Sequence, residues 1–193
     1  MKIVLATQNP GKISEIQALI PANIQVVTAR ECGIVEDIPE TGDTLEINAI
    51  QKAEFLFKKT GLPSLADDTG LEVEHLNGAP GVYSARYAGE AKDNNANMDK
   101  LLLELKDVKN RKARFRTVLA WATADGTKIF EGVIEGNIAQ QRMVGSYGFG
   151  YDPIFIPNGH QRSFAQMLPS EKSSMSHRGR ALDNWMRGGL NAH

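Results

Sequence analysis

The sequence predicts a mixed α/β protein built on a central sheet rather than a purely parallel, doubly wound one. Runs typical of buried strands alternate with helical patterns in the first half, and hairpin signals follow in the second half. The length of 193 residues fits a single domain, 1–193, with room for two lobes and a substantial hydrophobic core.

Composition and charge narrow the class of protein. The chain is 41% hydrophobic and 23% charged, and its net charge of −1 gives no support for a basic surface that binds nucleic acid. The single cysteine, Cys32, excludes an intrachain disulfide and a cysteine-rich zinc site. The first apolar run, 3–6, is too short for a signal peptide, and no run is long enough to cross a membrane. We therefore expect a cytoplasmic protein with no membrane partner.

The first three elements have the layout of a phosphate-binding turn. A strand at 3–6 leads through the polar loop 7–12 into a helix, whose apolar face contains Ile13, Ile16, Leu19 and Ile20. Backbone N–H groups at the helix start, the helix dipole and Lys12 would all favour an anion there. The glycine spacing excludes a Walker A loop. An ordinary connection with an exposed Lys12 explains the segment equally well.

A second strand at 24–27 precedes an acidic, irregular segment, 36–43. Thr44 is a good N-cap for a helix from about 45 to 59. Asn48 and Lys52 lie one turn apart on this helix. The simpler interpretation of the acidic segment is a solvated loop, and that of Lys52 is a surface lysine on an amphipathic helix.

The stretch 65–73 indicates a strand that presents two adjacent carboxylates and then turns at Gly70. Side chains alternate along a strand, so Asp67 and Asp68 should face opposite sides. Hard oxygen ligands at a strand end suit a divalent cation or a general base. Taken alone, the Asp-Asp pair favours a polar turn, and its position at a strand end is what supports the functional interpretation.

The second half of the chain predicts hairpins and one clear helix. A tight turn at 78–81 precedes 83–87, where Ser84 and Arg86 would share one side if the segment is extended. The helix at 94–106 has an apolar face that we assign to core packing. A strand at 113–121 turns at Asp125-Gly126 into a second strand at 128–134, with Ile138 as a candidate extension beyond Gly136.

The last two motifs contain aromatic, glycine and basic residues. Three glycines bracket aromatic side chains in 145–151, an arrangement that suits stacking of a flat base. Taken alone, a glycine-rich hairpin with core aromatics is the simpler interpretation. Ser176 can cap a C-terminal helix that opens with His177 and Arg178. Surface positions for both residues are the simpler interpretation.

Five motifs together resemble one family nearly end to end. They are 6–12, 66–71, 78–86, 148–153 and 176–179. They resemble the inosine triphosphate pyrophosphatase family, the Ham1-like noncanonical purine nucleoside triphosphate pyrophosphatases of the Maf/Ham1 group. The resemblance implies a long mixed central sheet with flanking helices that form two lobes around a substrate cleft, and a homodimer. It also implies Mg²⁺-dependent hydrolysis of dITP, ITP and XTP to the monophosphate and pyrophosphate, which cleanses the nucleotide pool.

The resemblance also assigns roles to residues. The residues that it implies contact the triphosphate are Thr7, Gln8, Asn9, Pro10, Gly11, Lys12 and Lys52. Asp68 would be the general base and a metal ligand, with Asp67 beside it as a further candidate metal ligand, and Thr69 would touch the substrate. The residues that it implies for the base pocket are Phe149, Gly150, Tyr151, Asp152, Lys172, His177 and Arg178. His177 and Arg178 would donate hydrogen bonds to a purine oxo group, where an adenine amino group would leave donors unpaired.

This sequence departs from the family pattern at four places. Pro39 occupies a position that is commonly acidic, so Glu40 is the candidate metal ligand of that loop. Ile47, Gln166 and Ser173 replace residues that are usually Glu, Glu and Asn. These losses motivate an alternative, a catalytically weakened nucleotide-binding protein of the same fold. A nucleic-acid-binding module using 111–116 is a more remote alternative, which the net charge disfavours.

Overall fold

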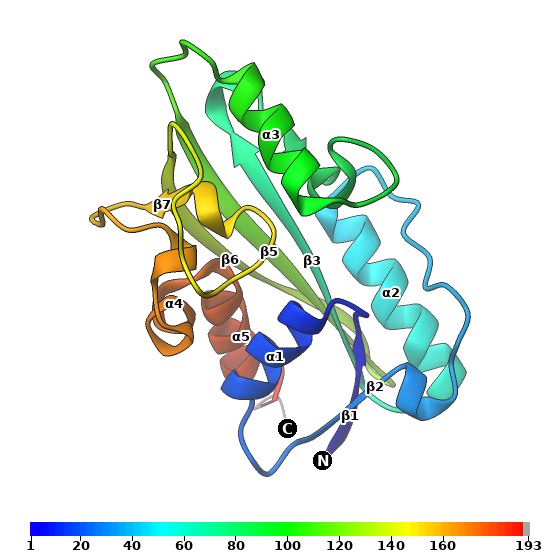
Figure 1. The fold of residues 1–193 in the computed structure, drawn as a ribbon. Helices are drawn as coiled ribbons and strands as arrows, with labels where there is room; N and C mark the ends of the chain where they lie inside the picture. Colours follow the sequence, from blue (N-terminus) through cyan, green and yellow to red (C-terminus); the bar gives the residue numbers. More distant parts are fainter. Residues whose placement is uncertain (191–193) are drawn as a thin grey trace. The chain divides into compact units, whose positions relative to one another are not determined.

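A computed structural model describes residues 1–190 and shows one mixed sheet with flanking helices (Figure 1). Within these residues the strands are β1 (Lys2–Ala6), β2 (Gln25–Thr28), β3 (Ser64–Val73), β4 (Pro80–Gly81), β5 (Lys112–Thr123), β6 (Gly126–Ile138) and β7 (Phe155–Pro157). The helices are α1 (Pro10–Leu19), α2 (Leu45–Thr60), α3 (Asn94–Glu104), α4 (Pro169–Met175) and α5 (His177–Gly188). The strand order is β2-β1-β3-β5-β6-β7, with β4 paired to β3, which confirms the predicted fold class.

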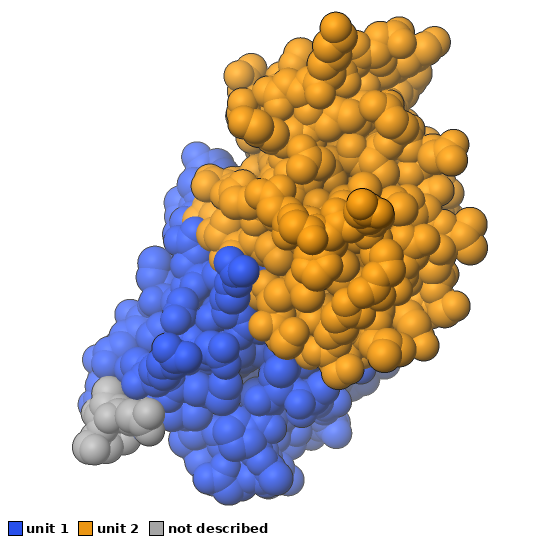
Figure 2. All heavy atoms as spheres, turned by 90° about the vertical axis from the view of Figure 1, so that its left-hand side faces the viewer, with its two compact units in different colours: residues 1–68, 117–132, 177–193 blue, residues 69–116, 133–176 orange. Residues whose placement is uncertain are grey.

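The chain divides into two compact units, which Figure 2 distinguishes by colour. Unit 1 comprises 1–68, 117–132 and the segment from His177 onward, and unit 2 comprises 69–116 and 133–176. Both units are assembled from segments distant in sequence, because β3, β5 and β6 each contribute residues to both. The division agrees with the two lobes that we expected, while a substrate cleft stays a prediction.

Unit 1 is a parallel α/β layer. β1 pairs in parallel with both β2 and β3, with Leu5 opposite Leu65. Ile3, Leu5 and Leu65 pack with residues of α1 and α5 in one core, which includes an edge-to-face contact between Trp121 and Trp185 at 5.3 Å. α2 covers the other face of these strands (Figure 1).

Local signals place the helices of unit 1 where the sequence predicted them. Asn9 caps α1 by accepting hydrogen bonds from two backbone N–H groups, and Pro10 occupies the first helical position. Thr44 caps α2, and the helix ends at Gly61, whose φ of 67° is the left-handed conformation that favours glycine.

Unit 2 is built on antiparallel pairing. β4 pairs with the end of β3, and β7 pairs with the end of β6. Its core joins the apolar face of α3 to the sheet and to the aromatic side chains of Phe115, Phe155 and Phe164. The predicted helix at 94–106 is confirmed as α3. The segment from Ser84 to Arg86 is a 3₁₀ turn rather than an extended chain.

The prediction that the Asp-Asp strand turns at Gly70 is wrong. β3 continues for ten residues through Gly70 to Val73. The glycine is required for close approach, because a Cβ there would lie 2.6 Å from the carbonyl oxygen of Gly81 on the paired strand β4.

No helix in the described part of the chain is long and apolar enough to cross a membrane.

Candidate active site

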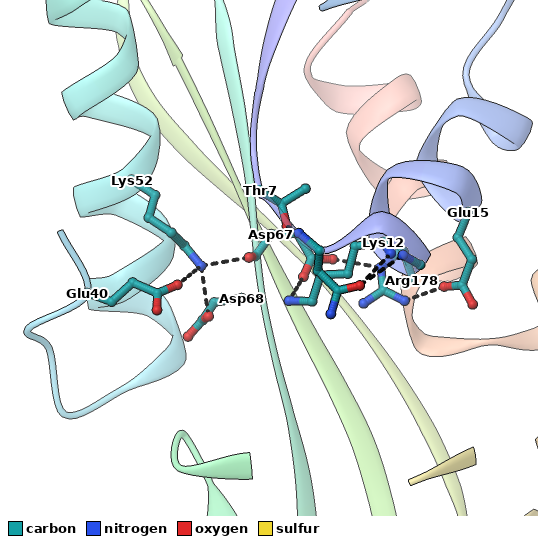
Figure 3. A network of polar contacts seen from close by, with 10 residues as sticks. Thr7, Lys12, Glu15, Glu40, Lys52, Asp67, Asp68 and Arg178 are labelled. Atoms are coloured by element: carbon teal, nitrogen blue, oxygen red, sulfur yellow. Dashed lines mark hydrogen bonds and ion pairs between the residues drawn. The ribbon is translucent and has the colours of Figure 1, made fainter. Parts of the chain in front are cut away.

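The two carboxylates of β3 face opposite sides of the strand, as predicted (Figure 3). Asp67 has the same orientation as Leu65 and faces α1 and α5. Asp68 has the same orientation as Ala66 and faces α2. This alternation gives each carboxylate a different set of basic partners, all of them in unit 1.

Asp67 lies fully buried between two cations. One carboxylate oxygen accepts a hydrogen bond from the ammonium of Lys12, and the other accepts one from Arg178 Nε at 2.8 Å. Burial alone would raise the pKa of Asp67, but Arg178 and Lys12 outweigh it and hold that pKa far below its usual range. The two cations therefore favour the ionised form of Asp67.

Arg178 has a second acidic partner on α1. Its Nη1 donates to the carboxylate of Glu15, and the guanidinium is fully buried. Burial opposes its charge, yet Asp67 and Glu15 raise the pKa of Arg178 above its ordinary value. Sequence reasoning missed Glu15, although its place one helical turn after Lys12 on α1 is the signal that could have found it.

Asp68 shares one lysine with the loop before α2. The Lys52 ammonium donates to Asp68 Oδ1 at 2.9 Å, to Glu40 Oε1 at 2.8 Å and to the backbone carbonyl of Asp67 at 2.8 Å. Burial raises the pKa of Asp68, and the nearby Lys52 only partly offsets this. Burial would lower the pKa of Lys52, but Asp68 and Glu40 outweigh it and raise that pKa. Lys52 is thus a fixed cation beside a carboxylate with enhanced proton affinity.

Hydrogen bonds to α2 hold the loop that carries Glu40. Gly42 N donates to Asn48 Oδ1 at 2.7 Å, and Gln51 exchanges hydrogen bonds with Thr41 at 3.0 and 2.9 Å. A Cβ on Gly42 would lie 2.4 Å from the side chain of Ile47, so glycine permits the close packing. The loop therefore has a defined path that directs Glu40 to Lys52.

The predicted anion loop is accessible at its centre. Gln8, Asn9 and Pro10 are exposed. Asn9 Oδ1 accepts from the N–H groups of Gly11 and Lys12 at 2.9 and 3.2 Å. Two N–H groups at the start of α1 are thus already bonded to the cap.

The start of α5 positions His177 and Arg178. Both are buried, with exposed fractions of 3% and 1%. Gly132 of β6 allows the close approach of this helix, because a Cβ there would lie 2.0 Å from the carbonyl oxygen of His177. A side chain at Gly132 would displace the helix start that carries both residues.

The aromatic loop forms a second cluster, within unit 2. Asp152 Oδ2 accepts from Phe149 N at 2.8 Å and from the Lys172 ammonium at 2.6 Å. That ammonium also lies 5.0 Å from the centroid of the Phe149 ring, within cation–π range. Gly148 has a φ of 80°, and a Cβ there would collide with Asp152. These contacts fix the backbone around a half-buried aromatic ring.

Tyr151 has a different place from Phe149. Its ring belongs to the core of unit 2, and its hydroxyl donates to the carbonyl oxygen of Ser84 at 2.7 Å. Phe149 is therefore the more accessible aromatic ring of the pair. Thr69, half-buried on β3, and Gly150, with a φ of 59°, complete the predicted residues of this unit.

The structure thus groups the predicted residues in two sets. Unit 1 holds the anion loop, Glu40, Lys52, the two aspartates, His177 and Arg178, whereas unit 2 holds Thr69, the aromatic loop and Lys172. His177 and Arg178 belong to unit 1 with the aspartates, and a base pocket that they share with the aromatic loop stays a prediction.

The charges of unit 1 fit a divalent cation. The network of Figure 3 contains three cations and four carboxylates, a formal surplus of one negative charge. Glu40 and Asp68 converge on the Lys52 ammonium, each through one carboxylate oxygen. Both oxygens of Asp67, in contrast, are bonded to cations. No group of three acidic, His or Cys side chains suited to a metal occurs among the described residues. Two carboxylates are nevertheless enough for Mg²⁺ when substrate phosphates supply further oxygens.

The departures from the family pattern have local consequences. Ile47 is 43% exposed, so it places an apolar side chain at the surface of α2. The side-chain oxygen of Gln166 accepts from Ser163 N at 3.1 Å, a hydrogen bond that a carboxylate could also accept. Ser173 Oγ donates to the carbonyl oxygen of Ser170 on α4.

Known proteins resemble this chain over nearly its whole length. The family model described as Ham1 family matches residues 3–187. The chain belongs to the Ham1 family. Proteins named dITP/XTP pyrophosphatase are 51% identical in Flavobacterium psychrophilum, over 94% of this chain and 95% of that one, and 53% identical in Porphyromonas gingivalis, over 94% and 93%.

Solved structures of Ham1 proteins have the same fold. The Coxiella burnetii protein matches with a TM-score of 0.89 and 43% identity over 100% of both chains. The Ham1 protein of Staphylococcus aureus matches with a TM-score of 0.88 and 41% identity over 98% of both. The resemblance inferred from five motifs is thereby confirmed for the family and the fold.

Proposed function

We propose that this Ham1-family protein hydrolyses dITP, ITP and XTP to the monophosphate and pyrophosphate, with Mg²⁺. The names of the relatives that match it over nearly their whole length support this activity. Within the structure, the observation that carries it is the convergence of Asp68 and Glu40 on Lys52, one strand residue away from the Lys12–Asp67–Arg178 cluster.

Asp68 is suited to take a proton from the attacking water. Its Oδ1 is held by Lys52, and Oδ2 makes no hydrogen bond within the described part of the chain. The raised pKa of Asp68 brings it closer to the working pH, which favours a general base. The water oxygen forms a bond to the α-phosphorus while its proton passes to Oδ2. The bond from that phosphorus to the bridging oxygen breaks, and pyrophosphate leaves.

Fixed positive charge would stabilise the substrate and the leaving pyrophosphate. Lys12 and Lys52 project from two different helices toward the two faces of β3. Their ammonium groups can donate to phosphate oxygens as negative charge develops on the leaving group.

Glu40 and Asp68 are the residues that would hold Mg²⁺. The ion would neutralise triphosphate charge, which the network itself, with its surplus negative charge, cannot do. We leave Asp67 outside this ligand pair, because Lys12 and Arg178 occupy both of its oxygens, and assign it to holding those two cations in place.

The aromatic loop would bind the purine. The ring of Phe149 supplies a stacking surface, which every purine can use and which gives affinity rather than selectivity. Selectivity requires donors that match an oxo group, and Lys172 beside Asp152 is a donor of this kind in unit 2. We further propose a homodimer, which the resemblance implies, and a cytoplasmic location, which is the expectation from the short apolar runs of the sequence.

A pyrophosphate-release assay tests the proposed function. The panel contains dITP, ITP, XTP, dATP and dGTP, each with Mg²⁺ and with a chelator. We expect release from the first three only, and only with Mg²⁺. Equal rates on dATP and dITP would contradict the selectivity.

The alternative, a nucleotide-binding protein with weakened catalysis, rests on the loss of carboxylates at Ile47 and Gln166. It predicts that ITP raises the melting temperature while no pyrophosphate appears. Turnover of dITP in the panel above would reject it.

A further inference from the structure

Ser84 joins three segments of unit 2. Its hydroxyl accepts a hydrogen bond from Leu71 N of β3 at 2.9 Å and donates to the carbonyl oxygen of Gly81 at 2.6 Å. Its own carbonyl oxygen accepts from the hydroxyl of Tyr151 at 2.7 Å. One residue with 7% exposure thus connects the strand that carries the aspartates to the aromatic loop.

The backbone around Ser84 is itself held in place. Asn97, on α3 and only 1% exposed, donates to the carbonyl oxygen of Ala85 at 3.0 Å and accepts from Ala88 N at 2.7 Å. A 3₁₀ turn from Ser84 to Arg86 fixes the direction of the Ser84 carbonyl. The acceptor that Tyr151 meets is therefore preset by the fold of unit 2.

Tyr151 hydrogen-bonds this 3₁₀ turn to the loop whose residues we assign to binding the purine. We define the base loop as residues 145–152. Within it, Asp152 accepts from Phe149 N, and Tyr147 N donates to the carbonyl oxygen of Ala165 at 3.1 Å. The ring of Tyr151 lies in the core, so its hydroxyl is the point at which the loop is hydrogen-bonded to the 3₁₀ turn.

We propose that Ser84 and the Tyr151 hydroxyl are a positioning pair for the base loop, and that they set the selectivity of the enzyme for its purine. Neither group needs to touch the base. Together they fix where the ring of Phe149 and the carboxylate of Asp152 stand before a nucleotide arrives. This role rests on the proposed function and gives a purpose to the motif 78–86, which contains Ser84 but no residue assigned to the substrate.

Tyr151→Phe is the principal test, because it removes only the hydroxyl and keeps the ring in the core. A mobile loop weakens ground-state and transition-state binding of the base alike, so KM should rise while kcat stays nearly constant. We expect KM for dITP to rise about three- to tenfold, the range for losing one hydrogen bond, and the preference for dITP over dATP to fall. Tyr83→Phe is the matched control, since Tyr83 is 53% exposed and adjacent to Ser84, and it should change neither quantity.

Ser84→Ala tests the other end of the connection. It should also raise KM for dITP. In the double variant with Tyr151→Phe, the fold-increase in KM should be smaller than the product of the two single increases, because both changes release the same loop. Strict additivity would show that the two groups act independently and would overturn the pairing.

Amide hydrogen exchange tests the same idea without substrate. Tyr151→Phe should speed exchange in 145–152 and at Leu71, while β1 in unit 1 exchanges as in the unaltered protein. Unchanged exchange in the base loop would overturn the proposal whatever the activity. Faster exchange together with an unaltered KM and an unaltered preference for dITP would show that the pair only stabilises the loop, and it would overturn the role in selectivity.

The two measurements separate this inference from the proposed function. Failure of the unaltered protein to hydrolyse any triphosphate would contradict the function, and the exchange data alone would then decide whether Ser84 and Tyr151 position the loop. Turnover by the unaltered protein, with both variants equal to it in KM and exchange, would contradict only the inference.

Discussion

Adjacent aspartates on one strand have opposite pKa shifts because their environments differ. Asp67 lies between two cations and stays ionised, whereas burial raises the pKa of Asp68, whose second oxygen makes no hydrogen bond within the described residues. Alternation along β3 produces this difference, since it turns one side chain toward α1 and α5 and the other toward α2. The two residues should therefore respond differently to the same substitution.

Asp68→Asn should lower kcat for dITP by about 10²- to 10⁴-fold, the usual contribution of a general base. The amide has nearly the same shape and can still accept from Lys52, which keeps Glu40 as a partner. Pyrophosphate release measures the loss, and circular dichroism checks the fold. Glu36→Gln, which alters an exposed ion pair with Lys59, is the control and should keep full activity. Full activity of Asp68→Asn would show that another group is the base.

Asp67→Asn should instead lower the free energy of unfolding by about 3–5 kcal/mol, because it leaves Lys12 and Arg178 without their shared buried anion. Urea unfolding of this variant and of Asp68→Asn gives the comparison, and the second variant should lose much less. Equal losses would contradict the distinction between the two carboxylates.

The pH dependence of stability follows from the lowered pKa of Asp67. A carboxyl whose pKa is lower in the folded protein than in the unfolded chain stabilises the fold above the unfolded value, about 3.9. That contribution is lost as the pH falls from this value toward the folded pKa. The stability difference between the unaltered protein and Asp67→Asn should therefore be constant near neutral pH and shrink below about pH 4. Urea unfolding with a chelator present measures it, and a difference that grows in acid would contradict the ion-pair origin.

At the scale of elements, α2 carries the lysine of the site and also holds the loop with its acidic partner. Asn48 and Gln51 bind the backbone of that loop on one side of the helix, and Lys52 binds Glu40 one position later. Packing at Gly42 is too close for any side chain. The position of Glu40 thus depends on Gly42, which has no side chain to contact a metal or a substrate.

Gly42→Ala should raise the Mg²⁺ concentration needed for half-maximal activity several-fold, because the added Cβ displaces the loop from Asn48 and moves Glu40. Glu40→Gln should act in the same direction by removing the charge. Titration of activity with Mg²⁺ measures both, and Glu36→Gln in the same acidic segment should leave the titration unchanged. A normal Mg²⁺ response of Gly42→Ala beside an impaired Glu40→Gln would contradict the positioning role of the glycine.

At the scale of the whole molecule, a nucleotide that binds the folded protein should raise its melting temperature. The variant Asp68→Asn with Mg²⁺ allows dITP to be tested without turnover. At a dITP concentration about 100 times Kd, the stabilisation is about 2.7 kcal/mol, or about 5 to 10 °C for a chain of this size. At the same concentration dATP should give a smaller shift. Equal shifts would show that the base pocket does not discriminate.

Much of this molecule is determined by its sequence. The periodicity of apolar residues, the cap at Thr44 and the turn at Asp125-Gly126 are local signals, and they predicted the longer strands and helices. The short elements β4, β7 and α4 were not predicted. Five short motifs in order predicted the family. These features could be inferred because each depends on residues close together in the chain.

Tertiary structure alone decided what each charged residue contacts. Arg178 meets Asp67 across 111 positions of the chain, and Glu15 meets Arg178 across 163. The continuation of β3 through Gly70 depends in the same way on Gly81 of another strand. Burial and the sum of nearby charges set the pKa of each aspartate, and both arise only when distant segments pack together. The sequence therefore determined that two carboxylates would face opposite sides of one strand, and folding decided which of them is neutralised by cations and which retains an oxygen for chemistry.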